Sequence, residues 1–339
     1  MKASKRMLAV LLALLLGAGV IHAGVLVSYA DTFFDAGDFR FAVTSGDAVS
    51  VAAYYGNSTE VTLPAEVNGR AVTGVYSRCF ENNASVTSVT LPEGYTSVGA
   101  FAFCGCQSLT QVTLPSTLKS IGLMAFNDCA ALEDIDLAQT DLRSIGFAAF
   151  NNCFALESVI MPDTLTSLGE NAFCNCASLS ELRLSGNLAV ISEYAFYGCS
   201  ALTDVAFPAL VNKLDTSCFE NAALTGVFVP DTVTSVGENA FAPSNAIVCF
   251  SGSAAAQYCA DSGSQAAVVL AKIAGDANSD GKVNVNDVTS IQRHLAEVEI
   301  LTEYEMLMAD VNGDKSVNVS DATMIQGYLA EYDIVFVEL

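Results

Sequence analysis

Two acidic loops near the end of the chain, residues 276–287 and 310–321, carry the side chains whose types and spacing are best suited to chemistry. In each loop, oxygen-bearing side chains recur at positions 1, 3, 5, 9 and 12, and position 7 offers a backbone carbonyl. This spacing wraps the six to eight oxygen ligands of a calcium ion around one centre. We therefore predict two bound calcium ions. The expected ligands are Asp276, Asn278, Asp280, Lys282, Asn284 and Asp287 in the first loop and Asp310, Asn312, Asp314, Ser316, Asn318 and Asp321 in the second.

Position 6 distinguishes the two loops. A sharp turn there favours glycine, and the first loop has Gly281 whereas the second has Lys315. A non-glycine residue in a left-handed conformation costs roughly 1–2 kcal/mol, so we expect the second site to bind calcium more weakly. The alternative is a pair of Asp- and Asn-rich surface turns, which two complete ligand sets in the same register disfavour.

An apolar-periodic stretch follows each loop, at residues 288–295 and 322–329, so each unit is predicted as a loop followed by a helix, without an entering helix. The duplication, with Asp at position 12 and Val-Asn at positions 8 and 9, resembles the type I dockerin domain over residues 272–339. The resemblance implies docking onto a cohesin module of a scaffold protein through positions 10, 11, 17, 18 and 22 of one duplicate. Those residues are Val285, Asn286, Gln292, Arg293 and Glu297, or Val319, Ser320, Gln326, Gly327 and Glu331. The class of cohesin stays open, because the best-known dockerins carry Ser-Thr at positions 10 and 11.

The body of the chain is repetitive, with phenylalanines 22 to 24 residues apart. A period in the low twenties is typical of leucine-rich repeats, in which each coil contributes one short strand and buries its apolar side against its neighbours. Leu114 and Pro115 illustrate the end of such a strand, because proline cannot donate to a ladder. The repeated phenylalanines are Phe80, Phe103, Phe126, Phe150, Phe173, Phe196, Phe219 and Phe241.

The pattern Leu-Thr-Ser-Leu-Gly-Glu-Asn-Ala-Phe-x-x-Cys-x-x-Leu resembles the BspA-like leucine-rich repeats of bacterial surface proteins over residues 58–246. The predicted fold is a β-rich leucine-rich-repeat solenoid of about eight coils, followed by a small all-α calcium-binding dockerin domain. We expect a signal peptide at residues 1–30, an N-terminal β cap at 31–60, the solenoid with its C-terminal capping helix at 61–270 and the dockerin domain at 271–339.

The N-terminus has the layout of a secretory signal peptide, with basic residues before an apolar run at residues 7–27. We expect cleavage after Ala30, with Ala23 as the alternative site and an uncleaved anchor as the third possibility. The predicted location is therefore extracellular, attached to the cell surface or to a cellulosome-type assembly. The 37 acidic and 14 basic residues give a net charge of −23, which excludes nucleic acid as a partner.

Eleven cysteines in a secreted chain usually indicate disulfides, but here their positions follow the repeat. Because a free cysteine behaves as a small buried hydrophobe, we expect a ladder of free thiols packed under successive coils. Five cysteines lie three residues after a repeat phenylalanine: Cys106, Cys129, Cys153, Cys176 and Cys199.

Catalytic side chains are sparse. The two histidines are His22 in the signal and His294 on the first predicted dockerin helix, so the solenoid offers no Ser-His or Cys-His pair. Carboxylates that could hydrolyse glycosides must face each other across a cleft, whereas Asp163 and Glu238 fall at loop positions. A dockerin-bearing enzyme of polysaccharide breakdown and a carbohydrate-binding module are the alternatives to a non-catalytic binding protein.

One outward column of the solenoid is the candidate recognition surface. Side chains alternate across a strand, so the residue between two core positions points outward, on the face that solenoids commonly use for partners. In the C-terminal half this column mixes apolar and charged residues, which favours a protein or glycan ligand. Its candidate residues are Asp136, Ile160, Arg183 and Phe228.

Overall fold

The computed structural model describes residues 32–44, 48–242, 245–262, 267–270, 273–279, 281–332 and 334–336. The predicted signal peptide, its cleavage site and the predicted ligand Asp280 lie outside the described residues. Within them, no helix is both long and apolar enough to cross a membrane.

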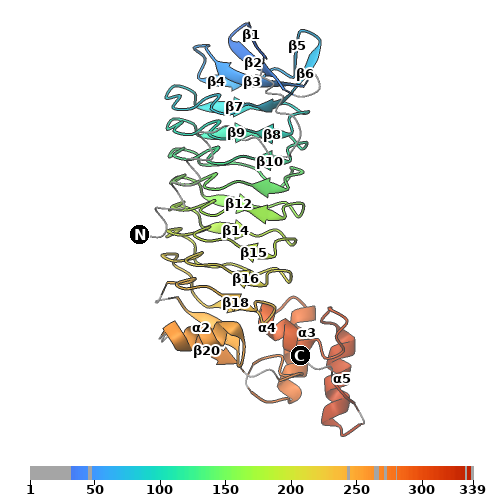
Figure 1. Ribbon diagram of the computed structural model, residues 1–339. Coiled ribbons are helices and arrows are strands. Elements are labelled where there is room, and N and C mark those ends of the chain that lie inside the picture. The colour runs from blue at the N-terminus through green and yellow to red at the C-terminus, as the bar shows by residue number, and fades with distance from the viewer. Residues whose placement is uncertain are drawn as a thin grey trace, which may run out of the picture. The chain divides into compact units, whose positions relative to one another are not determined.

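The first part of the chain is a β-solenoid of about nine turns (Figure 1), which confirms the predicted fold class. Six of the eight predicted strands are present and pair in parallel and in register, for example Ile160 opposite Arg183. Residues 134–136 and 204–206 form no strand, so this column is divided into three sheets. This column contains β4 (Glu60–Thr62), β7 (Ser88–Thr90), β9 (Gln111–Thr113), β12 (Ser158–Ile160), β14 (Glu181–Arg183), β17 (Val227–Val229), β19 (Ile247–Phe250) and β20 (Ala267–Leu270).

A second column of two-residue strands was not predicted, so the expectation of one strand per coil is wrong. Each of these strands consists of a half-exposed or exposed residue followed by an apolar residue that points into the solenoid, such as Ser144 followed by Ile145. The residue after such a strand must be glycine where the backbones of successive coils approach closely. A Cβ on Gly146, for example, would lie 2.6 Å from the Leu123 nitrogen of the preceding coil. The strands are β8 (Ser97–Val98), β10 (Ser120–Ile121), β11 (Ser144–Ile145), β13 (Ser167–Leu168), β15 (Val190–Ile191), β16 (Lys213–Leu214) and β18 (Ser235–Val236).

Both ends of the solenoid are covered. At the N-terminal end β2 (Phe39–Val43) and β3 (Val49–Tyr54) pair antiparallel, and β3 pairs parallel with β6 (Arg70–Val75), which continues into the second column. At the other end, helix α2 (Ala254–Ser262) packs against β18 and β19. The N-terminal strands are β1 (Thr32–Ala36), β2 (Phe39–Val43), β3 (Val49–Tyr54), β5 (Glu66–Val67) and β6 (Arg70–Val75).

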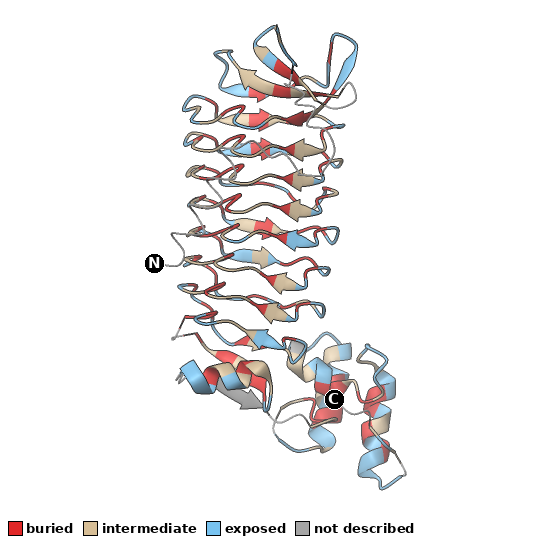
Figure 2. Cartoon of the chain, viewed as in Figure 1, coloured by how far each residue is buried: buried red, intermediate tan, exposed pale blue. Residues whose placement is uncertain are grey.

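The repeat phenylalanines are buried and form one continuous stack from coil to coil. Figure 2 colours the buried positions along the coils red. Neighbouring ring centroids from Phe80 to Phe241 lie 5.0 to 5.9 Å apart, and their planes differ by at most 13°. The predicted inward register is therefore confirmed. The ring of Phe150 is fully buried between those of Phe126 and Phe173.

All eleven cysteines are free, and the five repeat thiols are buried. Each of these five donates a hydrogen bond to the carbonyl oxygen of the phenylalanine in the preceding coil, at 3.0 to 3.3 Å. Cys129, for example, bonds to Phe103, and Cys176 to Phe150. Cysteine thus suits this position because it is small and apolar and still carries a weak donor.

These thiols are expected to resist alkylation in the folded protein at neutral pH. Burial raises the pKa of Cys106 and of Cys199 to about 12, so the reactive thiolate is scarce. Protein purified under reducing conditions and then transferred to denaturant without reductant should expose eleven thiols to a chromogenic reagent. If unfolding made fewer than five additional thiols reactive, the buried thiol ladder would be contradicted.

The C-terminal region is helical, with α3 (Val285–Leu295), α4 (Glu303–Ala309) and α5 (Val319–Leu329). Helices α3 and α5 follow the two acidic loops as predicted and pack against each other. Helix α4 corrects the expectation that neither loop has an entering helix, because its C-cap is Asp310, the first residue of the second loop. A small core that includes Val288, Ile291 and Ile325 joins these elements.

Candidate functional site

The second acidic loop is organised around its first and last carboxylates. The backbone N–H groups of Gly313 and Lys315 each donate to the Asp310 carboxylate at 2.8 Å. Asp321 is fully buried, and its two oxygens accept from the N–H groups of Asn312 and Asn318, at 3.4 and 2.9 Å. The backbone of the loop therefore wraps around the carboxylates at positions 1 and 12.

The first loop repeats this arrangement at equivalent positions. Asp276 accepts from the N–H of Gly281 at 2.9 Å, as Asp310 does from that of Lys315. Asp287 accepts from the N–H groups of Asn278 and Asn284, at 3.2 and 2.7 Å. Asp276 and Asp287 are both buried. The sequence duplication is thus also a duplication of the backbone hydrogen bonds to the carboxylates at positions 1 and 12.

Position 9 of each loop also begins a helix. Asn284 is the N-cap of α3 and Asn318 that of α5, and each side-chain oxygen accepts the N–H two residues later at 2.8 Å. Because these oxygens face the helix N-terminus, they suit the indirect ligation through water that is common at this position. Asp287 and Asp321 complete the capping boxes, so the loops fix the start of both helices.

Each of the two loops has one non-glycine residue in the left-handed region, so backbone strain gives no basis for the expected difference in calcium affinity. Each loop has left-handed residues at positions 4 and 6. The first has Ser279 and Gly281 there, and the second has Gly313 and Lys315, so each places one non-glycine residue in this conformation. The expectation of a weaker second site considered position 6 alone. Position 4 of the first loop, Ser279, is also left-handed, so the argument for a weaker second site is lost.

The donor set fits calcium. Every predicted ligand offers oxygen, the preference of a hard cation, and the buried carboxylates would be costly without a compensating positive charge. The buried hydroxyl oxygen of Ser279 has no hydrogen-bond partner among the described residues. Among the described residues, no three Asp, Glu, His or Cys side chains form a metal-binding cluster. Asp280, at position 5, is not one of the described residues.

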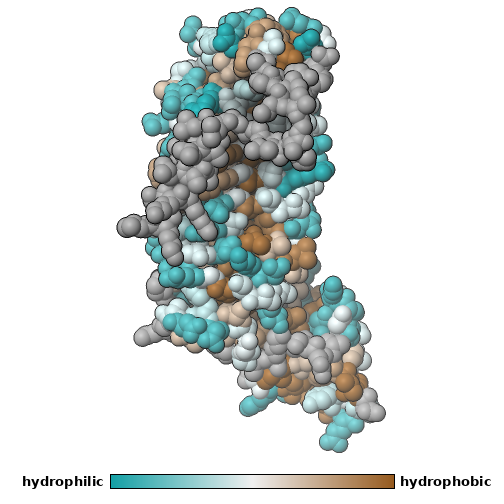
Figure 3. Space-filling model, in the orientation of Figure 1, coloured by the Kyte–Doolittle hydropathy of each residue, from teal (hydrophilic) through white to brown (hydrophobic). Residues whose placement is uncertain are grey.

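The residues predicted to contact a cohesin lie mostly on the surface of α3 and α5. Val285 and Val319 are about two-thirds exposed, at 66% and 68%. Asn286, Ser320, Gln292, Gln326, Arg293, Glu297 and Glu331 are exposed as well. Apolar side chains gather over this region in the space-filling view (Figure 3).

Gly327 is the exception and corrects the predicted contact set. It is buried, and a Cβ at this position would collide with the side chain of Ile334. The segment after α5 therefore covers position 18 of the second duplicate, where the first duplicate exposes Arg293. The two candidate docking faces share their valines and glutamines but differ at this position.

His294 has a local structural role. Its Nδ1 atom accepts the backbone N–H of Leu301 at 3.2 Å, which fastens the turn after α3. The acidic residues Asp163 and Glu238, considered as hydrolytic groups, are exposed as expected of a solvated surface. No catalytic domain is found in the chain.

The predicted recognition column of the solenoid is partly assembled. Ile160 and Arg183 lie side by side on β12 and β14. Asp136 is exposed one coil earlier, and its carboxylate accepts the N–H of Ala138 at 3.0 Å. Phe228 is only half-exposed, because its ring packs edge-on against that of Phe250 at 5.5 Å. Asp136 and Arg183 are the exposed members of the column, and Ile160, like Phe228, is half-exposed.

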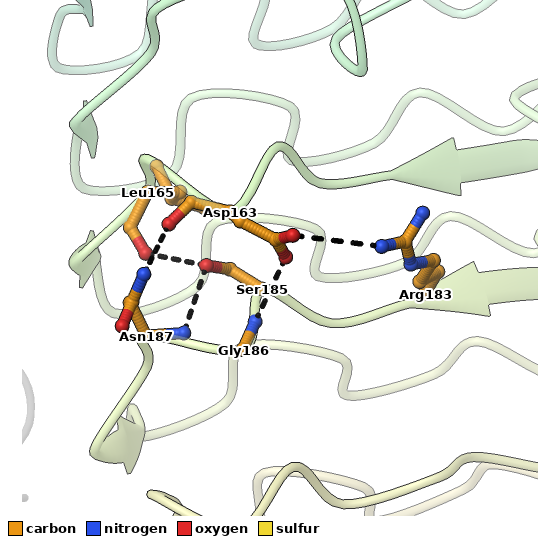
Figure 4. A network of polar contacts seen from close by, with 6 residues as sticks. All are labelled: Asp163, Leu165, Arg183, Ser185, Gly186 and Asn187. Atoms are coloured by element: carbon orange, nitrogen blue, oxygen red, sulfur yellow. Dashed lines mark hydrogen bonds and ion pairs between the residues drawn. The ribbon is translucent and has the colours of Figure 1, made fainter.

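A polar network fixes the surroundings of Arg183 (Figure 4). Its guanidinium lies 3.8 Å from the carboxylate of Asp163, and that carboxylate also accepts the N–H of Gly186 at 3.3 Å. The buried Ser185 donates to the carbonyl of Leu165 at 2.7 Å. The turn after β14 is thus tied to the preceding coil, while both charged groups stay exposed to solvent.

A family model for the BspA type leucine rich repeat region matches residues 73–146 and 138–248, in six copies. The chain belongs to this family. A second model, the dockerin type I domain, matches residues 274–330. Dockerin domains of this type bind calcium, and dockerin domains in general bind cohesin modules. Both modules are characteristic of extracellular, surface-associated proteins.

Solved structures of bacterial leucine-rich-repeat proteins are similar to the solenoid. A leucine rich cell surface protein from Faecalibacterium prausnitzii is 26% identical, with a TM-score of 0.50 over 66% of this chain and 78% of that one. A leucine-rich repeat protein from Bacteroides ovatus is 22% identical, with a TM-score of 0.53 over 68% and 65%, and it supports the fold alone. No curated protein sequence matches the chain.

Proposed function

We propose that this BspA-type protein is a secreted, non-catalytic binding protein that its dockerin domain tethers, in a calcium-dependent manner, to a cohesin of an extracellular scaffold of the cellulosome type. The observation that carries the proposal is the repeated loop geometry. In each loop, the carboxylates at positions 1 and 12 bend the backbone, and position 9 starts a helix that exposes a valine. Two calcium ions, one per loop, would hold both helices in place.

The proposed docking face has two versions, one on each helix. Val285 with Asn286 and Val319 with Ser320 stand at the exposed N-terminal ends of α3 and α5. Exposed apolar residues of this kind, next to polar ones, are common in protein interfaces. Because both versions share the valine and a glutamine, we expect a cohesin to engage either helix.

Aspartate substitutions on the two faces test this docking mode. Changing Val285 and Asn286 to Asp should leave the affinity for a cohesin nearly unchanged, and so should changing Val319 and Ser320 to Asp. The combined variant should abolish binding, because the partner cannot pair the charges it would bury. Titration against a panel of cohesins measures all three, with unchanged calcium binding and helix content as the test of folding.

Two results would alter the docking proposal. Complete loss of binding from one single-face variant would show that only that helix docks, and the covered Gly327 identifies α5 as the poorer face. Binding by the combined variant at full affinity would exclude both faces. Arg183→Ala, which changes a charge on the solenoid surface, is the matched control and should bind as the unmodified chain does.

We further propose that the solenoid displays a recognition surface formed by Asp136, Ile160 and Arg183. The surface combines an exposed charge of each sign with a half-exposed apolar side chain, a mixture found in protein interfaces. The full chain, used as bait on native cell-surface extract, should capture a protein through this column. The double variant Ile160→Asp, Arg183→Glu should no longer capture that protein, whereas the combined dockerin variant should still capture it. Equal capture by all variants would exclude the column.

A further inference from the structure

The capping helix α2 leaves a cavity beside the last coil of the solenoid. The stacked phenylalanine rings of neighbouring coils lie only 5.0 or 5.1 Å apart in the middle of the solenoid, whereas a helix with its side chains is about 10–12 Å wide. A helix therefore cannot fill the place of one further coil along its whole length. A cavity of about 600 Å³ remains, lined by α2 on one side and by residues 234–239, which include β18, on the other.

Both sides of this cavity carry hydrogen-bonding side chains. The turn after β18 contributes Glu238 and Asn239, and α2 contributes Gln257 and Asp261. All four are exposed. The amide of Gln257 donates to the Asp261 carboxylate at 2.8 Å, so these two groups are already aligned on the helix. Carboxylates only accept hydrogen bonds, whereas the amides of Asn239 and Gln257 both donate and accept.

Tyr258 adds an aromatic surface to the cavity. Its hydroxyl donates to the carbonyl oxygen of Phe241 and accepts the N–H of the same residue, at 3.2 Å each. The hydroxyl is therefore engaged with the last coil. The half-exposed ring lines the cavity and is the part of Tyr258 that a ligand can contact.

The composition of the lining disfavours three classes of ligand. The charged side chains that line the cavity among the described residues are the carboxylates of Glu238 and Asp261, which repel an anion. An apolar ligand would remove the polar side chains from water without giving them partners. A single metal ion would occupy only a small part of the cavity. A neutral ligand with many hydroxyl groups suits it best, because each hydroxyl can both donate and accept.

A second cavity of about 430 Å³ adjoins the first, since Thr234 and Ala254 line both. It lies at the N-terminal end of α2, and Asp231, Ser251 and Ser253 are part of its lining. Its polar groups are thus again hydroxyls and a carboxylate. The two cavities together provide room for more than one sugar ring.

We propose that these two adjoining cavities at the C-terminal cap bind a short neutral oligosaccharide. The carboxylates of Glu238 and Asp261 accept hydrogen bonds from sugar hydroxyls, and the amides of Asn239 and Gln257 donate to them. The ring of Tyr258 contacts the apolar face of one sugar. None of the lining residues belongs to the dockerin helices or to the recognition surface, so the proposal is independent of the proposed tether and of its partner.

Titration calorimetry of the full chain in calcium, against a panel of trisaccharides, tests the site. The panel contains neutral cellotriose, maltotriose, xylotriose and mannotriose, the anionic trigalacturonate and the cationic trimer of glucosamine. We expect at least one neutral trisaccharide to bind, with one equivalent per chain, and to bind more tightly than either charged one. Absence of binding by every neutral trisaccharide, or tighter binding of a charged one, would overturn the proposal. Loss of one equivalent of bound calcium in Asp261→Ala would identify a metal site instead and overturn it too.

Glu170→Ala is the matched control for Glu238→Ala. Both glutamates are exposed and stand in the same sequence, Gly-Glu-Asn-Ala-Phe, at residues 169–173 and 237–241, but only Glu238 lines the cavity. Glu238→Ala and Gln257→Ala should each weaken binding of the trisaccharide about tenfold, because each removes a hydrogen bond to the ligand. Glu170→Ala should leave the affinity unchanged. Circular dichroism verifies that each variant has folded, and equal affinities in all three variants would overturn the proposal.

Discussion

Replacement of Phe150 by alanine is expected to lower the free energy of unfolding by about 3–5 kcal/mol, the range for deleting a buried aromatic side chain. The ring is fully buried and stacks on Phe126 at 5.1 Å and Phe173 at 5.0 Å, so its loss leaves a cavity between two coils. Denaturant unfolding of the solenoid, followed through its transition midpoint and slope, measures the change.

Arg183→Ala is the matched control for this substitution. Its ion pair with Asp163 is long, at 3.8 Å, and both side chains are about two-thirds exposed, at 64% and 66%. Such a pair contributes little, so we expect a change below about 0.5 kcal/mol. An equally small effect from both substitutions would mean that the inward and outward columns are wrongly assigned.

Removal of calcium is expected to unfold or loosen residues 273–336. Asp287 and Asp321 are fully buried carboxylates, and the charges within each loop repel one another until a cation lies among them. Calcium at a thousand times its dissociation constant would contribute about 4 kcal/mol per site. Calorimetry with calcium and with chelator should show a C-terminal transition that depends on the ion.

Single-site variants refine this experiment. Asp276→Ala and Asp310→Ala should each remove one of two equivalents of bound calcium, and the losses should be similar, because each loop carries one strained non-glycine residue. A C-terminal transition unchanged by chelator would contradict the calcium sites.

The solenoid was largely predictable because its repeat fixes the register. One period of about 23 residues brings every repeat phenylalanine to the same place, so the inward column followed from counting. The second strand column was missed since a pair such as Ser144 and Ile145 is too short to show an alternating pattern. The sequence indicated buried thiols, but their bonds to carbonyls of the preceding coil depend on how closely successive coils approach.

The acidic loops were predictable from ligand spacing alone, but their surroundings were not. Helix α4 has only seven residues, too few for a clear apolar period. Gly327 was assigned to the surface by its place in the duplicate, whereas its burial arises from Ile334, whose counterpart in the first duplicate, Ile300, is exposed. The features that were missed thus depend on packing between segments, which local patterns do not report.

Titration of the unmodified full chain with type I cohesins, in calcium and in chelator, tests the tethering function most directly. We expect at least one cohesin to form a complex in calcium and to lose it in chelator, while a chain that ends before residue 271 forms none. Absence of binding to every cohesin in calcium, or binding that persists in chelator, would contradict the calcium-dependent tether.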